Sequence, residues 1–343
     1  MVRQFLQNDI ASILDTNQVD VLKNKTILIT GATGLIGSMC CKALSEIGKN
    51  NDLGLTVVAL ARNSKRAEEV LADVMENQNI VLCDQPLTSA LHFDEKIDYI
   101  IHTACPTASN TFITQPVETV QAIVNGTMNV LELAKQTGCE SVVYLSSMEA
   151  YGQILHEDLL SPENVGYVNP LSLRSCYPEG KRMAENLCIG YYSEYQVPVK
   201  AIRLAQTFGP GIPVSDGRVF AQFIRSALNG ENIVMFTEGG AKRMYLDTMD
   251  AVNAVITVLL KGESGQVYNA GNPATYSSIR EMAELVIREF GNGKCELVID
   301  RSKDVGQYPP DNMLNLDVSP LMNLGWKPKY ELKEMYTRMI DNV

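Results

Sequence analysis

The chain has 343 residues, of which 45% are hydrophobic and 20% charged, the composition of a globular protein with one large or two ordinary domains. Its formal net charge of −11 argues against a non-specific nucleic-acid binder, which carries a basic surface. No apolar run reaches the roughly 18 residues of a membrane helix, and the first residues lack the layout of a secretion signal. We therefore expect a cytoplasmic protein that does not span a membrane. The eight cysteines show no zinc-ligand spacing, which favours reduced thiols over disulfides or a metal site.

Short apolar segments alternate with helical patterns over the first two thirds of the chain. The strand-like segments are KTILIT (25–30), LTVVALA (55–61), NIVLCD (79–84), IDYIIHTA (97–104), SVVYLSS (141–147) and VPVKAIRLA (197–205). Among the helical patterns between them, 117–138 closes on Gly138. Near-continuous apolar strands separated by helices predict a parallel sheet covered on both faces. We therefore expect a doubly wound α/β (Rossmann) sheet, with ligands beyond the C-terminal ends of its strands.

The sequence changes character after its last strand-like segment in this series. A Gly- and Pro-rich stretch follows at 208–217, and strand-like and helical patterns then alternate less regularly. We expect residues 1–205 to form the dinucleotide-binding domain, to which the chain returns at about 245–271. Residues 206–244 and 272–343 are expected to form a smaller, mixed α/β substrate-binding cap over the C-terminal edge of the sheet.

A glycine-rich turn joins the first predicted strand to a helix. Gly31, Gly34 and Gly37 follow the strand at 25–30, and the helix is predicted to begin near Leu35. Glycines in such a turn let the backbone approach a pyrophosphate, whose charge is met by the N-terminus of the helix. We therefore expect a nicotinamide dinucleotide here. The residues expected to contact it are Gly31, Thr33, Gly34, Leu35, Ile36 and Gly37.

The choice between NAD and NADP depends on the end of the second strand. An acidic residue there would bind the adenosine ribose, but the sequence has Arg62, and an Arg can accommodate the 2′-phosphate of NADP. Arg62 is equally explained as part of a solvated basic face, so both cofactors stay open. Asp84, which closes the third strand, is a candidate contact to adenine, with a strand-end cap as the alternative. Thr103, near the end of the fourth strand, is a further candidate for cofactor binding.

Tyr177 and Lys181 stand four residues apart, which places them on one face of a helix. Pro178 suits the first turn of a helix, so the tyrosine is expected at the helix entrance. A phenol with a pKa of about 10 is a poor base, and lowering that pKa by about three units takes about 4 kcal/mol. Lys181 and an oxidised nicotinamide ring could supply this stabilisation, so we expect Lys181 to contact the cofactor as well. Ser147 ends a strand about thirty residues earlier, where its hydroxyl could hydrogen-bond the reacting oxygen.

Together these residues resemble the extended short-chain dehydrogenases/reductases, in the NAD-dependent epimerase/dehydratase family that acts on nucleotide sugars. Further segments are similar to motifs of that family, among them its Asn-x-Gly-Thr helix start and its near-terminal LGWxP. These segments are 124–127, 207–210, Arg243 with Asp250, and 324–328. The resemblance implies a tightly bound NAD or NADP, a nucleotide-sugar substrate and a homodimer. It also implies substrate contacts by Ser147, Gln206 and Arg243, with Gln206 in place of the family's usual Asn.

The residues around the tyrosine favour one branch of the family. The segment 175–185 is similar to that of UDP-glucuronate decarboxylases, as is the Pro- and Ser-rich stretch 105–116. Glu149 stands where decarboxylases and sugar dehydratases carry a glutamate, and a carboxylate suits chemistry at the sugar C5. Capping of the following turn is the alternative role for Glu149. Met148 stands where 4,6-dehydratases carry an acid, and because a thioether cannot donate a proton, it argues against 4,6-dehydration.

The expected reaction begins with oxidation at the sugar C4, for which Tyr177 takes the hydroxyl proton. A substrate with a carboxylate at C5 then becomes a β-keto acid and loses CO2, with Arg243 holding that carboxylate or a phosphate. Without the carboxylate, hydride return to the other face of the sugar makes the protein a 4-epimerase, the first alternative. Two further classes stay open: an NADPH-dependent carbonyl reductase, favoured by Arg62, and a non-enzymatic dinucleotide sensor, against which the complete catalytic set argues.

Overall fold

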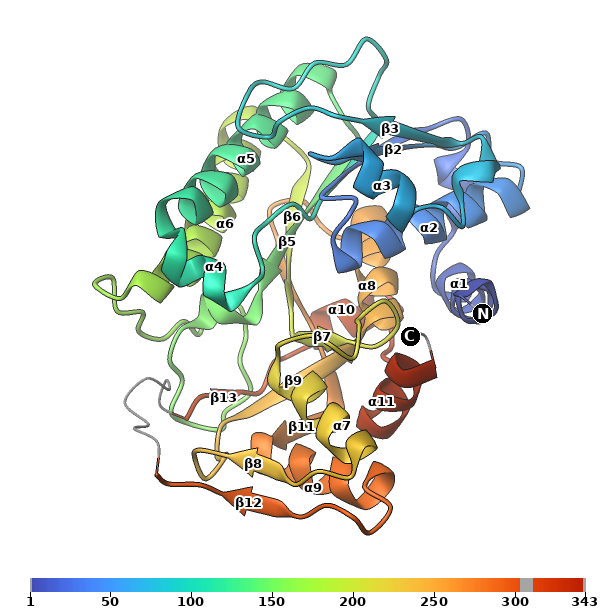
Figure 1. Ribbon diagram of the computed structural model, residues 1–343. Coiled ribbons are helices and arrows are strands. Elements are labelled where there is room, and N and C mark those ends of the chain that lie inside the picture. Colours follow the sequence, from blue (N-terminus) through green and yellow to red (C-terminus); the bar gives the residue numbers. More distant parts are fainter. Residues whose placement is uncertain (1, 303–310, 342–343) are drawn as a thin grey trace.

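The central feature of the fold is a seven-stranded sheet in which every adjacent pair of strands runs parallel (Figure 1). The computed structural model describes residues 2–302 and 311–341. In spatial order the strands are β10 (Val267–Ala270), β6 (Val199–Leu204), β5 (Ser141–Ser147), β4 (Tyr99–His102), β1 (Thr26–Thr30), β2 (Thr56–Leu60) and β3 (Ile80–Cys83). The strand order therefore reverses next to β1, the point where doubly wound sheets bind ligands. The predicted doubly wound α/β class is confirmed.

Helices cover both faces of this sheet because its strands are apolar on both sides. Alternate residues of β1 face opposite cores, Ile27 and Ile29 one of them and Leu28 the other. The first core is shared with α1 (Val2–Thr16), α2 (Leu35–Asn50) and α8 (Thr248–Lys261), and the second with α5 (Pro116–Thr137) and α6 (Cys176–Tyr195). The segment 124–127, predicted at a helix start, lies inside α5, because that helix already begins at Pro116.

Shorter helical segments lie in the connections between these elements. They are α3 (Ser64–Val70), α4 (Ser109–Thr114), α10 (Ser319–Asn323), η1 (Val19–Leu22), η2 (Met75–Asn77), η3 (Met148–Tyr151) and η4 (Leu173–Ser175). In the described part of the chain, every helix is too short or too polar to cross a lipid bilayer. Within residues 2–302 and 311–341, no three His, Cys, Asp or Glu side chains are grouped to hold a metal ion.

Two smaller sheets lie beside the large one, at the lower end of the molecule in Figure 1. One contains β11 (Asn272–Ser278), β9 (Lys242–Asp247), β13 (Met313–Leu314) and β7 (Gln206–Phe208), and the other pairs β12 (Leu297–Ile299) with β8 (Ile233–Met235). A third hydrophobic core joins these sheets to α7 (Val219–Asn229), α9 (Ile279–Phe290) and α11 (Leu332–Asp341). Between β9 and β11 the chain passes through α8, which packs on the large sheet, and β10, a strand at the edge of that sheet. The predicted division into a dinucleotide-binding domain and a substrate-binding cap stays a prediction.

A buried cluster of charges connects the first helix to the last. On α11, Arg338 binds Asp9 of α1 at 2.7 Å and Asp247 at the end of β9 at 3.0 Å. Tyr330 donates its hydroxyl hydrogen bond to Asp9 at 2.6 Å, and its backbone N–H donates to Asp250 of α8. The helices α1 and α11 accordingly lie near each other in Figure 1.

Candidate active site

The glycine turn after β1 has the shape that a dinucleotide needs. Gly31 has a φ of +71°, and a Cβ there would lie 2.7 Å from the Thr103 hydroxyl oxygen. A Cβ on Gly37 would collide with the Gly31 carbonyl oxygen. Both positions therefore require glycine, because any side chain would push the turn away from the adjoining strand.

The N-terminus of α2 is free to bind an anion. Gly34 is its N-cap and has no side chain that could cap the first turn, and that turn contains no acidic residue. The backbone N–H groups of the first turn and the helix dipole therefore face a phosphate without competition. Leu35 and Ile36 are half-buried and pack against the hydrophobic cores, and Thr33 is half-buried in the turn. The residues present thus fit the pyrophosphate of a nicotinamide dinucleotide.

The candidate contacts to the adenosine end lie past two neighbouring strands. Leu60 of β2 pairs with Cys83 of β3, so Arg62 and Asp84 follow adjacent strand ends. Both side chains are exposed, and Asp84 accepts a hydrogen bond from the Ser64 hydroxyl at 3.3 Å. This position at the C-terminal edge of the sheet is accessible to a ribose or its 2′-phosphate.

Thr103 lies beneath the glycine turn and ties it to the sheet. Its hydroxyl donates a hydrogen bond to the Thr30 carbonyl at 2.7 Å. Thr30 in turn is hydrogen-bonded through its own hydroxyl to His102 Nδ1 at 2.7 Å, and His102 Nε2 lies 3.2 Å from the Thr127 hydroxyl on α5. Burial, and then the Lys181 charge, lower the pKa of His102 to about 3, so the ring is neutral. Sequence reasoning gave His102 no role, although its place at the end of the fourth strand, next to Thr103, was a usable signal.

The structure brings the predicted catalytic set together. Ser147 is the last residue of β5, and Tyr177 and Lys181 lie in the first two turns of α6. The Ser147 hydroxyl lies near enough to the Tyr177 phenol to lower its pKa, and the Lys181 Nζ atom lies 5.8 Å from the centroid of the tyrosine ring. The ring of Tyr177 stacks on Phe112 at a centroid distance of 4.4 Å. The predicted helix entrance is confirmed, because α6 begins at Cys176.

The surroundings of Tyr177 act on its pKa in opposite directions. Burial raises the pKa of the phenol well above its usual value, and the Cys105 thiol and the Glu149 carboxylate raise it further. The hydrogen bond from Ser147 and the charge of Arg174 lower it. Lys181 is buried and donates a hydrogen bond to the Leu145 carbonyl at 2.6 Å, which fixes the ammonium group next to the strand. Proton removal by this phenol therefore depends on added positive charge at the site.

Glu149 is held by a cation that sequence reasoning missed. Arg174 binds both carboxylate oxygens, with its two terminal nitrogens at 2.8 and 3.2 Å from them. The backbone N–H of Glu149 donates to the Ser147 hydroxyl at 3.2 Å, so η3 starts directly after Ser147. Arg174 lies in η4, three residues before Tyr177. No spacing rule links the two charges, which stand twenty-five residues apart in the sequence.

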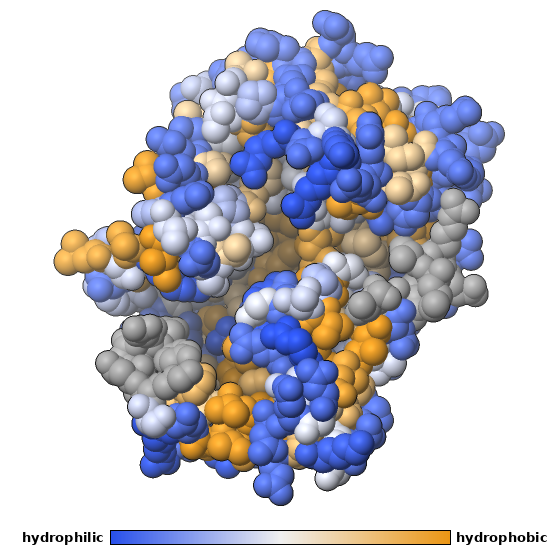
Figure 2. All heavy atoms as spheres, in the orientation of Figure 1, coloured by the Kyte–Doolittle hydropathy of each residue, from blue (hydrophilic) through white to orange (hydrophobic). Residues whose placement is uncertain are grey.

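Gln206 and Arg243 lie on neighbouring strands of the second sheet. Gln206 begins β7, two residues beyond Leu204, the strand neighbour of Ser147. It pairs with Tyr245 of β9, and Arg243 precedes that residue by two positions. The Nε atom of Arg243 is buried and has no hydrogen-bond partner within the described residues. Figure 2 shows a hollow between the part that carries the large sheet and the part that carries this second sheet.

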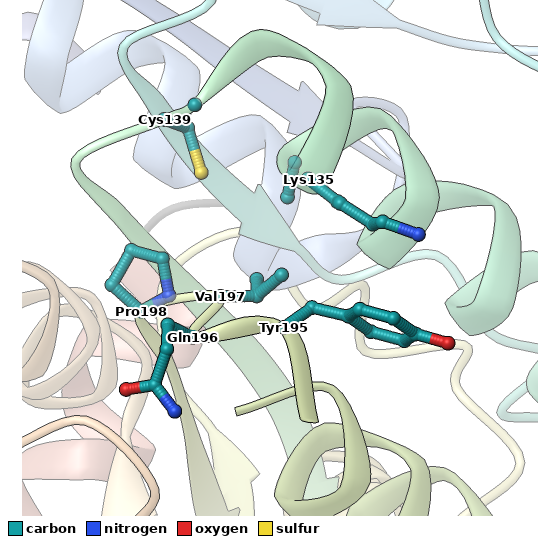
Figure 3. Close-up of a pocket in the computed structure, with 8 residues that line it drawn as sticks. Lys135, Cys139, Tyr195, Gln196, Val197 and Pro198 are labelled. Carbon is teal, nitrogen blue, oxygen red and sulfur yellow. The ribbon is translucent and has the colours of Figure 1, made fainter. Parts of the chain in front are cut away.

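A separate pocket of about 280 Å³ lies at the opposite ends of β5 and β6 (Figure 3). It is lined by the last turns of α5 and α6 and by the residues that follow them, among them Lys135, Cys139, Tyr195 and Pro198. Because these residues precede the strands whose C-terminal ends carry or adjoin the catalytic set, the pocket is remote from the candidate chemistry.

Comparisons with known proteins agree with this geometry. The model of the NAD dependent epimerase/dehydratase family matches residues 27–271. UDP-glucuronic acid decarboxylase 3 of Arabidopsis thaliana is 33% identical over 91% of this chain and 86% of its own length. UDP-glucuronic acid decarboxylase 1 of Xenopus tropicalis is 31% identical over 92% of this chain and 71% of its own.

Solved structures of nucleotide-sugar enzymes share the fold. A UDP-glucose 4-epimerase of Thermotoga maritima has a TM-score of 0.72 at 23% identity, covering 92% of this chain and 98% of its own. A UDP-glucuronic acid 4-epimerase of Bacillus cereus, crystallised with UDP-glucuronic acid and NAD, has a TM-score of 0.74 at 20% identity, with the same coverage. With its glycine turn, its doubly wound sheet and the match over residues 27–271, the chain belongs to the NAD dependent epimerase/dehydratase family.

Proposed function

We propose that the protein is an NAD-dependent decarboxylase that converts UDP-glucuronate into a UDP-pentose and CO2. The observation that carries the proposal is the meeting of Ser147 and Tyr177 with Glu149, whose carboxylate is paired with Arg174 beside them. The resemblance of the chain to UDP-glucuronic acid decarboxylases over most of its length supports the same reaction. The glycine turn and the open end of α2 would hold the pyrophosphate of the cofactor.

In the first step Tyr177 takes the proton of the sugar C4 hydroxyl. Ser147 donates a hydrogen bond to the same oxygen, and Lys181 stabilises negative charge on the phenol. A dinucleotide held by the glycine turn and the N-terminus of α2 would supply reversible hydride transfer at C4 and a positive charge that favours the phenolate. The protein thus supplies position and charge for an oxidation that leaves a ketone at C4.

The ketone makes the C5 carboxylate unstable. A 4-keto sugar with a carboxylate at C5 is a β-keto acid, so breaking the C5–C6 bond releases CO2 and moves the electron pair onto the C4 oxygen. Ser147 and the protonated Tyr177 would donate hydrogen bonds to that oxygen as its negative charge develops. A proton taken up from water at C5 then restores the ketone, and Tyr177 gives its proton back to the C4 oxygen when the hydride returns to C4. Glu149, next to Ser147 in η3, would lie near C5, where its negative charge disfavours the carboxylate of the substrate.

A 4-epimerase acting on the same substrate is the second candidate. It is favoured by the shared fold with the UDP-glucuronic acid 4-epimerase and uses the same oxidation at C4. It differs in that the carboxylate is retained and the sugar presents its other face before hydride returns.

The test is mass spectrometry of the products after incubation of the holoprotein with UDP-glucuronate and catalytic NAD or NADP. A nucleotide product lighter by CO2 establishes decarboxylation, and an isobaric product establishes epimerisation. An unchanged substrate with both cofactors would overturn both readings.

Within this function the residues 1–205, rejoined at about 245–271, would bind the cofactor, and residues 206–244 and 272–343 would bind the UDP-sugar. Residues 1, 303–310 and 342–343 of these ranges lie outside the described residues. Gln206 and Arg243 would contact the substrate, Arg243 through a buried Nε atom that can donate to an anion. The eight cysteines are all free thiols, as in a protein that works in the reducing cytoplasm.

The active form would be a homodimer that pairs α5 and α6 with the same helices of a second copy. Apolar side chains lie exposed along these two helices, and in a monomer they would remain in contact with water. They are Val117, Val120, Met128, Met183 and Ile189. Light scattering on the wild type and on a Val117→Glu/Met183→Glu double variant tests this, with a dimer expected for the first and a monomer for the second.

A further inference from the structure

We propose that Arg174 selects the substrate by binding the C5 carboxylate of the sugar, in competition with Glu149. The inference rests on the proposed function and adds the residue that distinguishes a uronate from a neutral hexose. In the free protein the guanidinium is occupied by Glu149; a uronate supplies a second carboxylate that displaces Glu149 or shares the guanidinium with it.

The position of the ion pair follows from the two segments that carry the catalytic hydroxyls. Glu149 stands two residues after Ser147, and Arg174 three residues before Tyr177. Arg174 lies over the ring of Phe112, with 5.8 Å between its guanidinium carbon and the ring centroid, and the opposing partner of that ring is Tyr177. When the C4 oxygen of a sugar contacts both hydroxyls, C5 is the neighbouring ring carbon, and its substituent lies close to the same two segments. The pair is therefore beside the place that the substituent occupies.

Exposure and hydrogen bonding leave Arg174 able to bind an anion. Its side chain is 42% exposed and that of Glu149 30%, so the pair is accessible from solvent. Lys181, the neighbouring cation, is 3% exposed and already donates to the Leu145 carbonyl. The pair with Glu149 uses two of the five N–H donors of the guanidinium, a planar group that matches carboxylates well.

Competition between two carboxylates gives the two residues opposite effects on binding. Loss of Arg174 removes the counter-charge and leaves Glu149 to repel a uronate. Loss of the Glu149 charge frees Arg174 and removes the repulsion, so a uronate binds more tightly. UDP-glucose has a hydroxymethyl group at C5, which carries no charge, so neither change alters its binding much.

The experiment measures dissociation constants by calorimetry on the NAD-loaded protein, with UDP-glucuronate and UDP-glucose as ligands. For Arg174→Gln we expect UDP-glucuronate to bind at least about 10-fold more weakly and UDP-glucose within about 2-fold of the wild type. For Glu149→Gln we expect UDP-glucuronate to bind about 3- to 10-fold more tightly and UDP-glucose to be unaffected. Arg280→Gln is the matched control, because it breaks an exposed ion pair with Glu284 on α9.

Each outcome counts for or against the inference. Equal weakening of both ligands by Arg174→Gln, or weaker uronate binding in Glu149→Gln, would mean that the pair only maintains the local structure, and would overturn it. A wild type that decarboxylates UDP-glucuronate while Arg174→Gln binds it normally overturns the inference alone. A wild type that binds UDP-glucose but not UDP-glucuronate overturns the proposed function as well.

Discussion

Tyr177 is the side chain on which the proposed chemistry depends most. Its side chain is buried and stacked on Phe112, which fixes the plane of the ring, and the Ser147 hydroxyl lies close enough to the phenol to lower its pKa. Because burial raises the pKa of this phenol, its use as a base depends on the positive groups around it. Removing the oxygen alone should therefore abolish proton transfer while the ring keeps its packing.

We predict that Tyr177→Phe lowers kcat on UDP-glucuronate by about 10²- to 10⁴-fold, the usual contribution of a general base. Binding of UDP-glucuronate, measured by calorimetry, should change by less than about 3-fold, since the phenyl ring still stacks on Phe112. Tyr191→Phe, in the same helix but remote from Ser147, is the control and should keep wild-type turnover. A Tyr177→Phe variant with normal kcat would show that another group removes the proton.

Arg62 offers a second test at the same scale. If its exposed side chain meets a 2′-phosphate, Arg62→Ala should weaken NADP binding by about 10-fold and leave NAD binding within about 2-fold. Fluorescence titration of the cofactor-free protein with both dinucleotides measures the difference. Equal affinities for NADP before and after the substitution would assign Arg62 to the solvated surface.

Single residues divide into those that sequence spacing could identify and those it could not. The placement of Tyr177 and Lys181 on one face of a helix was predictable, because residues four positions apart are neighbours on a helix surface. Gly31 was identifiable because it follows an apolar strand directly. The partnership of Arg174 with Glu149 was not, since it joins two irregular segments whose approach is decided by the packing of α6 against β5.

At the scale of elements, α6 connects catalysis to the interior of the sheet. Tyr177, Lys181 and Glu185 follow one another at four-residue intervals and face β5 and β6. Glu185 accepts hydrogen bonds from Ser146 at 2.5 Å and from Arg203 of β6 at 2.9 and 2.7 Å. The buried ion pair therefore fixes the rotation of the helix that presents the tyrosine.

We predict that Glu185→Ala lowers the free energy of unfolding by about 3 to 5 kcal/mol, because Arg203 is left as a buried, unpaired charge. Urea unfolding followed by circular dichroism measures the loss. Glu194→Ala, an exposed position near the end of the same helix, should change stability by less than about 0.5 kcal/mol. A small effect for Glu185→Ala would mean that water replaces the carboxylate beside Arg203.

The inner strands of the large sheet were predictable because both of their faces are buried, so that their sequences are almost continuously apolar. The strands of the second sheet were less predictable from the sequence. β7 is only three residues long, and β11 carries a register irregularity between Asn272 and Ser277. Such strands form because β9 lies between them, and that neighbour is known only once the chain has folded.

At the scale of the whole molecule, buried carboxylates make stability depend on pH. Burial, and then repulsion from Asp247, raise the pKa of Asp250 to about 7, although the backbone N–H groups of Lys329 and Tyr330 donate to it. Asp9 adds repulsion, and Arg338 binds Asp9 and Asp247. A carboxyl group whose pKa is raised on folding stabilises the folded state below its unfolded pKa and loses that contribution as pH rises through the folded value.

We predict that Asp250→Asn, which resembles the protonated side chain, becomes more stable relative to the wild type as pH rises from 5 to 8. With a folded pKa of about 7 and an ordinary value of 3.8, the difference between the two proteins should grow by roughly 2 to 3 kcal/mol over that interval. Urea unfolding at several pH values measures it. A difference that stays constant from pH 5 to 8 would show that Asp250 does not titrate in this range.

The pairing of Arg338 with Asp9 also has a consequence for synthesis. The ribosome adds Arg338 more than three hundred residues after Asp9. Before Arg338 is added, the Asp9 carboxylate of α1 and the Asp247 carboxylate both lack the guanidinium that pairs with them in the folded protein. The final packing of α1 therefore follows the synthesis of Arg338, and a chain truncated before this arginine should be more sensitive to proteolysis than one that contains it.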